Sequence, residues 1–127
     1  MEDIKDLKSI KLLVDEFYKK VRADELLGPV FNDVIKDGWQ PHLEKMYAFW
    51  NSVLFGVPGF KGNPFARHAP LPIGAEHFDR WISMFNETVA EHFEGEKAKE
   101  AKSRAGMIAV MFQSKLAAIK NGKGIIL

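Results

Sequence analysis

The stretch AEHFDRWISMFNETVAEHF, residues 75–93, decides the fold class of this chain. Its large apolar residues recur every three or four positions, at Phe78, Trp81, Ile82, Phe85 and Val89. This spacing places them on one face of an α-helix, because an α-helix completes a turn every 3.6 residues. Most of the other positions are polar or charged. The stretch therefore predicts a long amphipathic helix with one buried face.

The same periodicity extends outward from this stretch. Residues 96–120 continue it, and residues 39–55 and about 4–21 precede it. A shorter helix is expected after the Gly28-Pro29 pair, since proline favours the first turn of a helix. The inward positions expected in the last segment are Ala101, Ala105, Ile108, Met111, Phe112, Leu116 and Ile119. No segment shows the alternation of a half-buried strand, so the sequence predicts an all-α fold.

Residues 56–74 interrupt the helical pattern. Four glycines and four prolines in this segment leave no room for a long helix or strand. Residues 65–68 are compatible with a single helical turn. Pro70 disfavours helical backbone at Ala69 and so ends that turn just after His68. We therefore expect His68 on a short, proline-bounded turn inside an irregular region.

Length and composition restrict the class of protein. The 127 residues are enough for one domain with its own core, so we expect a single domain over residues 1–127. The net charge of +1 favours neither a nucleic acid nor an anionic membrane as a partner. With no cysteine, disulfides, thiolate metal sites and cysteine-linked cofactors are excluded. The charged N-terminus and the lack of a long apolar stretch favour a cytoplasmic protein.

Aromatic residues make up 12% of the chain, which is a heavy load for a domain of this size. Such side chains fill cores, and they also suit a large, flat, apolar ligand. His42 lies on the apolar face of residues 39–55, and His68 lies on the proline-bounded turn. Either histidine alone is more often a hydrogen-bonded core residue than a ligand. No H-E-x-x-H motif or carboxylate set completes a zinc or di-iron site around them.

Five motifs resemble those of the group III (P-type) truncated haemoglobins, and the resemblance covers residues 4–120. They are DEFYKKVRAD around Tyr18, LGPVFN around Phe31, PHLEKMYAFW from Pro41 to Trp50, GNPFARHAPLP around His68, and HFDRWISMF around Trp81. Any one of them alone is weak, whereas the set is specific. The resemblance implies a shortened globin fold, with helices in a two-over-two sandwich, and haem b as the cofactor.

The resemblance also assigns roles to individual residues. His68 matches the proximal histidine that ligates the haem iron. Tyr18, His42 and Trp81 match three residues of the distal pocket, opposite that ligand. Their hydroxyl, imidazole and indole groups are hydrogen-bond donors suited to a bound gas. Phe31 matches the phenylalanine that packs on the haem.

Four further residues are expected at the cofactor. Met46 follows His42 by one helical turn, at a position that lines the haem, and a flexible thioether fills such space well. Phe49 is expected to pack on the haem. Arg67 and Lys45 are candidates for pairing with a haem propionate, with a solvated surface charge as an equal alternative. His77 and His92 are expected to be surface or capping residues.

Three functions are compatible with this sequence. The leading one is a haem-b globin that binds dioxygen, nitric oxide or carbon monoxide, with oxygen transport as one role. The second is a redox enzyme, either a nitric oxide dioxygenase or a peroxidase-like protein, served by an unidentified reductase. The third is a haem-free helical interaction module whose aromatic faces pack on one another.

Overall fold

The computed structural model describes residues 1–58 and 74–120, with side chains as far as Lys115. Its helices are α1 (Leu7–Ala23), α2 (Leu27–Ile35), α3 (Trp39–Phe55), α5 (Ala75–His92) and α6 (Glu96–Lys120). The described residues contain no strand, so the all-α prediction is confirmed. Within those residues, no helix has the length and apolar character needed to cross a membrane.

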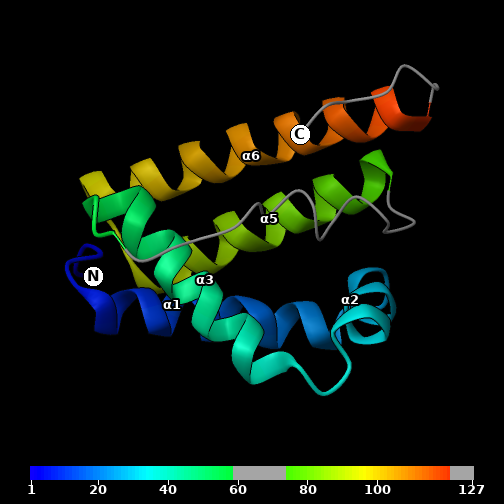
Figure 1. Ribbon diagram of the computed structural model, residues 1–127. Coiled ribbons are helices and arrows are strands. Elements are labelled where there is room, and N and C mark those ends of the chain that lie inside the picture. The colour runs from blue at the N-terminus through cyan, green and yellow to red at the C-terminus, as the bar shows by residue number, and fades with distance from the viewer. Residues whose placement is uncertain (59–73, 121–127) are drawn as a thin grey trace.

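The helices form two stacked pairs (Figure 1). In one pair, α5 and α6 run antiparallel and pack along their length, with a reversal at Gly95. In the other pair, α1 packs against α3, and the short α2 joins them at one end. The pairs meet where α1 packs on α5 and α3 packs on α6. This is the two-over-two sandwich that the family resemblance implies.

The carboxylate of Asp3 fixes the start of α6. Its oxygens accept hydrogen bonds from the backbone N–H groups of Lys97, at 2.9 Å, and Ala98, at 2.8 Å. These groups lie in the first turn, where a helix has no internal acceptor for them. Asp3 comes so close to Gly95 that a Cβ there would lie 2.6 Å from the Asp3 Cγ. With a φ of +131°, position 95 therefore needs glycine.

The core lies between the two pairs and is largely aromatic. Phe17 of α1 and Phe85 of α5 meet edge to face, with 5.2 Å between their ring centroids. Trp50 stacks on Phe85 at 4.9 Å, and Trp81 stacks on it at 5.8 Å. The inward positions predicted in α1, which are Ile10, Val14, Phe17 and Val21, are all buried.

Among the predicted inward positions of α6 whose side chains are described, Met111 is wrong, because it is 44% exposed. Leu116 and Ile119 lie outside the described side chains. The buried stripe of α6 runs through Ala101, Ala105, Ala109 and Phe112. Met111 is one residue from Phe112, and one residue turns about 100° around a helix. Its side chain therefore leaves the stripe, although its spacing from Ile108 fitted the expected face.

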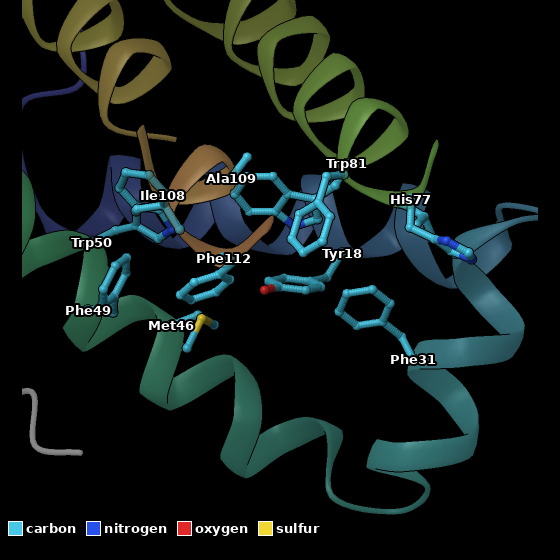
Figure 2. Close-up of a pocket in the computed structure, with 12 residues that line it drawn as sticks. Tyr18, Phe31, Met46, Phe49, Trp50, His77, Trp81, Ile108, Ala109 and Phe112 are labelled. Carbon is cyan, nitrogen blue, oxygen red and sulfur yellow. The ribbon is translucent and has the colours of Figure 1, made fainter. Parts of the chain in front are cut away.

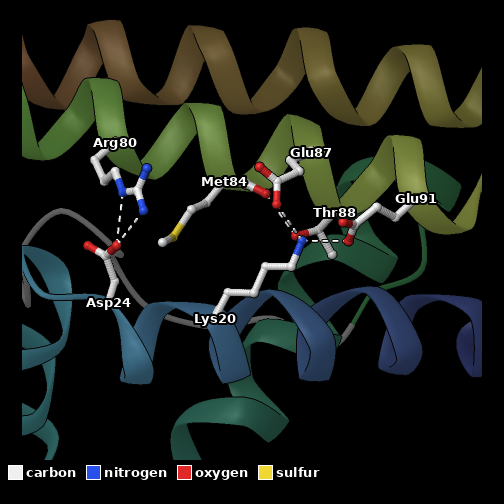
Figure 3. Close-up of polar contacts among 7 residues, drawn as sticks. All are labelled: Lys20, Asp24, Arg80, Met84, Glu87, Thr88 and Glu91. Atoms are coloured by element: carbon white, nitrogen blue, oxygen red, sulfur yellow. Dashed lines mark hydrogen bonds and ion pairs between the residues drawn. The ribbon is translucent and has the colours of Figure 1, made fainter.

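Two sets of ion pairs hold α1 to α5 on the outside of the core (Figure 3). The carboxylate of Asp24 accepts hydrogen bonds from Arg80, at 2.7 and 2.9 Å. Its other oxygen accepts from the N–H groups of Leu26 and Leu27, so Asp24 also caps the start of α2. About one turn before Asp24, Lys20 bridges Glu87 and Glu91.

Asp24 contributes to acid stability. Its pKa is lowered, since the hydrogen bonds and the charge of Arg80 outweigh the effect of burial, which raises it. A lowered folded-state pKa gives stability that is present above the unfolded value of about 3.9 and is lost as the pH falls through the folded value. Replacing Asp24 with Asn should therefore lower the unfolding free energy at pH 7 by about 1 kcal/mol and flatten its decline below pH 4.

Urea unfolding at pH 7 and at pH 3.5 measures both effects. Glu87→Gln is the matched control, because that carboxylate is exposed and caps no helix. It should change the unfolding free energy by less than about 0.5 kcal/mol. Equal losses in the two variants would contradict the role given to Asp24.

Candidate ligand pocket

An apolar pocket lies between the two helix pairs, near α2 (Figure 2). It holds about 700 Å³ of empty space, part of which is open to solvent. The described lining residues are Tyr18, Leu27, Phe31, Met46, Phe49, Trp50, His77, Phe78, Trp81, Ile108, Ala109 and Phe112.

Five of the residues named from the sequence line this pocket together. They come from four helices and are Tyr18, Phe31, Met46, Phe49 and Trp81. Phe17 lies behind two of them, with its ring centroid 4.9 Å from that of Tyr18 and 5.6 Å from that of Trp81. The core of the fold thus supports the side chains that face the pocket.

Tyr18 places a phenol in an apolar environment. The side chain is buried, and Figure 2 shows its hydroxyl pointing into the space between the drawn residues. Burial raises the pKa of Tyr18 well above its usual range, because the phenolate would lose its hydration. The phenol therefore keeps its proton at every physiological pH and remains a hydrogen-bond donor.

His42 lies beside Tyr18 and is not among the side chains that line the pocket. Its ring meets the Tyr18 ring edge to face, at 5.0 Å between centroids, and the Trp39 ring at 5.8 Å. Its Nε2 atom is buried. Trp39 is covered in turn by the guanidinium of Arg22, at 4.5 Å from the ring centroid. The structure thus packs His42 between the rings of Tyr18 and Trp39, in contact with a residue of the lining.

Three predicted site residues remain, and the structure describes one of them, Lys45. Lys45 is exposed and is not part of the lining. His68 and Arg67 fall outside the described residues, so their predicted roles stay predictions. Among the residues that are described, no group of three His, Asp or Glu side chains is placed to hold a metal ion.

Sequence reasoning missed His77, which was expected at the surface or as a cap. It does cap α5, because its Nδ1 accepts a hydrogen bond from the N–H of Gly74 at 3.0 Å. However, its side chain is only 14% exposed and lines the pocket. The spacing to Trp81, four residues later, was the pattern that could have revealed it, because such a pair shares one helix face.

Of the α6 residues in the lining, Ile108 and Phe112 were expected only as core positions, and Ala109 was not predicted. Ala109 and Phe112 are buried and form a second apolar cluster with Phe78. Helical periodicity cannot separate a residue that packs on a neighbouring helix from one that faces a cavity between helices. Their place in the lining therefore needed the tertiary arrangement.

Comparisons with known proteins agree with this arrangement. The family model described as bacterial-like globin matches residues 2–115. The group 3 truncated hemoglobin ctb of Campylobacter jejuni is 37% identical over 112 residues, which cover 85% of this chain and 88% of that protein. The group 2 truncated hemoglobin YjbI of Bacillus subtilis is 34% identical over 82 residues, covering 61% and 59% of the two chains.

A solved structure also has this fold. The crystal structure of the group III truncated hemoglobin from Campylobacter jejuni superposes with a TM-score of 0.84 and 35% sequence identity. The match covers 91% of this chain and 95% of that one. Sequence and structure therefore show that the chain belongs to the bacterial-like globin family and, within it, to the group III truncated haemoglobins.

Proposed function

We propose that this protein is a haem-b globin that binds dioxygen and other diatomic gases, nitric oxide and carbon monoxide among them. The observation that carries the proposal is an apolar, aromatic pocket with the Tyr18 hydroxyl inside it. Membership of the truncated haemoglobins supports it. Oxygen transport, a cytoplasmic location and a reductase partner are further parts of the proposal.

The residues of the pocket fit a haem. The porphyrin ring is flat and apolar, and eight of the twelve described lining residues carry no nitrogen or oxygen in the side chain. Phe31, Phe49 and Met46 present two rings and a flexible thioether to that space. We propose that His68 would ligate the haem iron, on the resemblance of its motif alone. Arg67 and Lys45 are proposed to pair with the propionates.

Haem, when bound, supplies the iron atom at which a diatomic gas binds. Tyr18 then acts as a donor, because its buried phenol stays protonated and points into the pocket. Trp81 offers an indole N–H from α5, and its ring also packs on Phe17. Each buried hydrogen bond to the gas is worth about 1–3 kcal/mol, so two of them slow its escape at least about tenfold.

His42 is assigned a supporting part in the same pocket wall. Its ring packs edge to face on Tyr18 and so limits the positions that the phenol can take. A phenol held in one orientation loses less entropy when it donates to a bound gas. Whether the imidazole N–H also donates is a further part of the proposal.

The assignment of His68 is tested by replacing it with Gly. The proposed bond to the iron should be lost, so that the variant binds haem at least about tenfold more weakly and loses the native Soret spectrum. His92→Ala is the control, because His92 lies at the far end of α5 and outside the pocket lining. A His68→Gly variant with native haem affinity and spectrum would exclude His68 as the ligand.

The donor role of Tyr18 is tested with Tyr18→Phe. Removing only the hydroxyl should speed dioxygen dissociation about ten- to a hundredfold, with a smaller effect on carbon monoxide, which is the poorer acceptor. Tyr47→Phe is the matched control, because the Tyr47 hydroxyl donates to Asp15, away from the pocket lining. Stopped-flow dissociation rates that are equal in wild type and Tyr18→Phe would contradict the role.

A redox enzyme is the second candidate, and the stacked rings of Trp81, Phe85 and Trp50 favour it. They form a continuous aromatic contact from the pocket into the core. As a nitric oxide dioxygenase, the oxygenated protein should consume nitric oxide rapidly and be restored by a matched reductant. Turnover that stays slow with every reductant would leave gas binding as the function.

A haem-free interaction module would remain as the function if added haem produced no Soret band.

A further inference from the structure

His77 is a pocket residue to which the proposed function gives no part. Four of the twelve described lining residues carry a nitrogen or oxygen in the side chain, namely Tyr18, Trp50, His77 and Trp81. Trp50 is buried against Phe85, and Tyr18 and Trp81 both pack on Phe17. His77 lies instead at the edge of the pocket, at the first turn of α5 (Figure 2).

The hydrogen bond from Gly74 determines which nitrogen of His77 can donate. The N–H of Gly74 points at Nδ1, which must therefore be the unprotonated nitrogen of a neutral ring. The proton then lies on Nε2, which becomes a hydrogen-bond donor. The side chain is mostly buried and its ring is fixed by the cap, so this donor is held in place.

The surroundings of His77 favour a negative ligand. Backbone N–H groups at the start of a helix carry a partial positive charge, and His77 lies in that first turn. The acidic neighbour, Glu76, is 76% exposed, and its nearest oxygen is 3.9 Å from Nδ1, on the capping side of the ring. Water screens an exposed carboxylate of this kind, so it opposes an anion at Nε2 only weakly.

Haem combines a flat apolar ring with two carboxylates along one edge. When the ring enters an apolar pocket, those carboxylates need either water or a donor at the rim. We propose that the Nε2–H group of His77 donates a hydrogen bond to a haem propionate and so makes His77 part of the cofactor site. This inference rests on the proposed function, because it requires that the pocket holds haem. Lys45, which the sequence suggested as a partner of a propionate, is not among the described lining residues.

His77→Glu separates this role from the capping role. Glutamate at the third position of a helix also caps its start, so the fold and the thermal midpoint should be retained. Its carboxylate, however, repels a propionate where the imidazole attracts it. Release of ferric haem to excess apomyoglobin should therefore be at least about tenfold faster than in the wild type.

Two controls complete the experiment. In His77→Gln, the side-chain oxygen can accept from Gly74 while the NH₂ group donates, so its haem release should lie within about threefold of the wild type. The second control repeats the measurement with haem whose two propionates are methyl esters. Without carboxylates, the wild type and His77→Glu should release the haem at rates within about twofold of each other.

Either of two results would overturn the inference while leaving the proposed function intact. One is a His77→Glu variant that releases natural haem no faster than the wild type. The other is an acceleration that is equally large with the dimethyl ester, since it could not then come from a propionate. A wild-type protein that forms no Soret band with haem would instead overturn the proposed function, and this inference with it.

Discussion

The packing of Phe17 against three aromatic rings connects the core of this protein to its pocket. Its ring centroid lies 4.9 Å from Tyr18, 5.2 Å from Phe85 and 5.6 Å from Trp81, in edge-to-face contacts with each. Such contacts have a preferred geometry and add to the free energy of burial. Phe17 is 2% exposed, so little room remains for the ring to move. The positions of the Tyr18 phenol and the Trp81 indole thus follow from the packing that stabilises the fold.

Much of the fold could be predicted from the sequence, because helical periodicity reflects burial on one face. The inward residues of α1 and the bounds of α3 and α6 were anticipated in this way. Met111 was not, since a residue at the edge of a stripe satisfies the spacing while its side chain leaves the interface. Periodicity gives a direction around the helix axis, and the width of the interface depends on the neighbouring helix.

The pocket was predicted less completely than the fold. Tyr18, Phe31, Met46, Phe49 and Trp81 were named from motifs, and the structure brings them together in one lining. His77 was missed because a histidine near a helix start is adequately explained as a cap. Its place in the pocket lining depends on where α2 and α6 lie, and a local sequence pattern does not give the positions of other helices. His42 was named from its apolar helix face, and its ring packs edge to face on Tyr18, so its predicted part in the pocket stays a prediction.

The central claim is that the space beside Tyr18 and Trp81 holds one haem. It is tested most directly by titrating the haem-free protein with ferric haem while following tryptophan fluorescence and the Soret band together. Trp50 and Trp81 both line the pocket, so a haem bound there lies within quenching range of both. The account predicts that quenching and the Soret band saturate together at one haem per chain. A Soret band that grows without quenching, or that does not saturate near one equivalent, would contradict it.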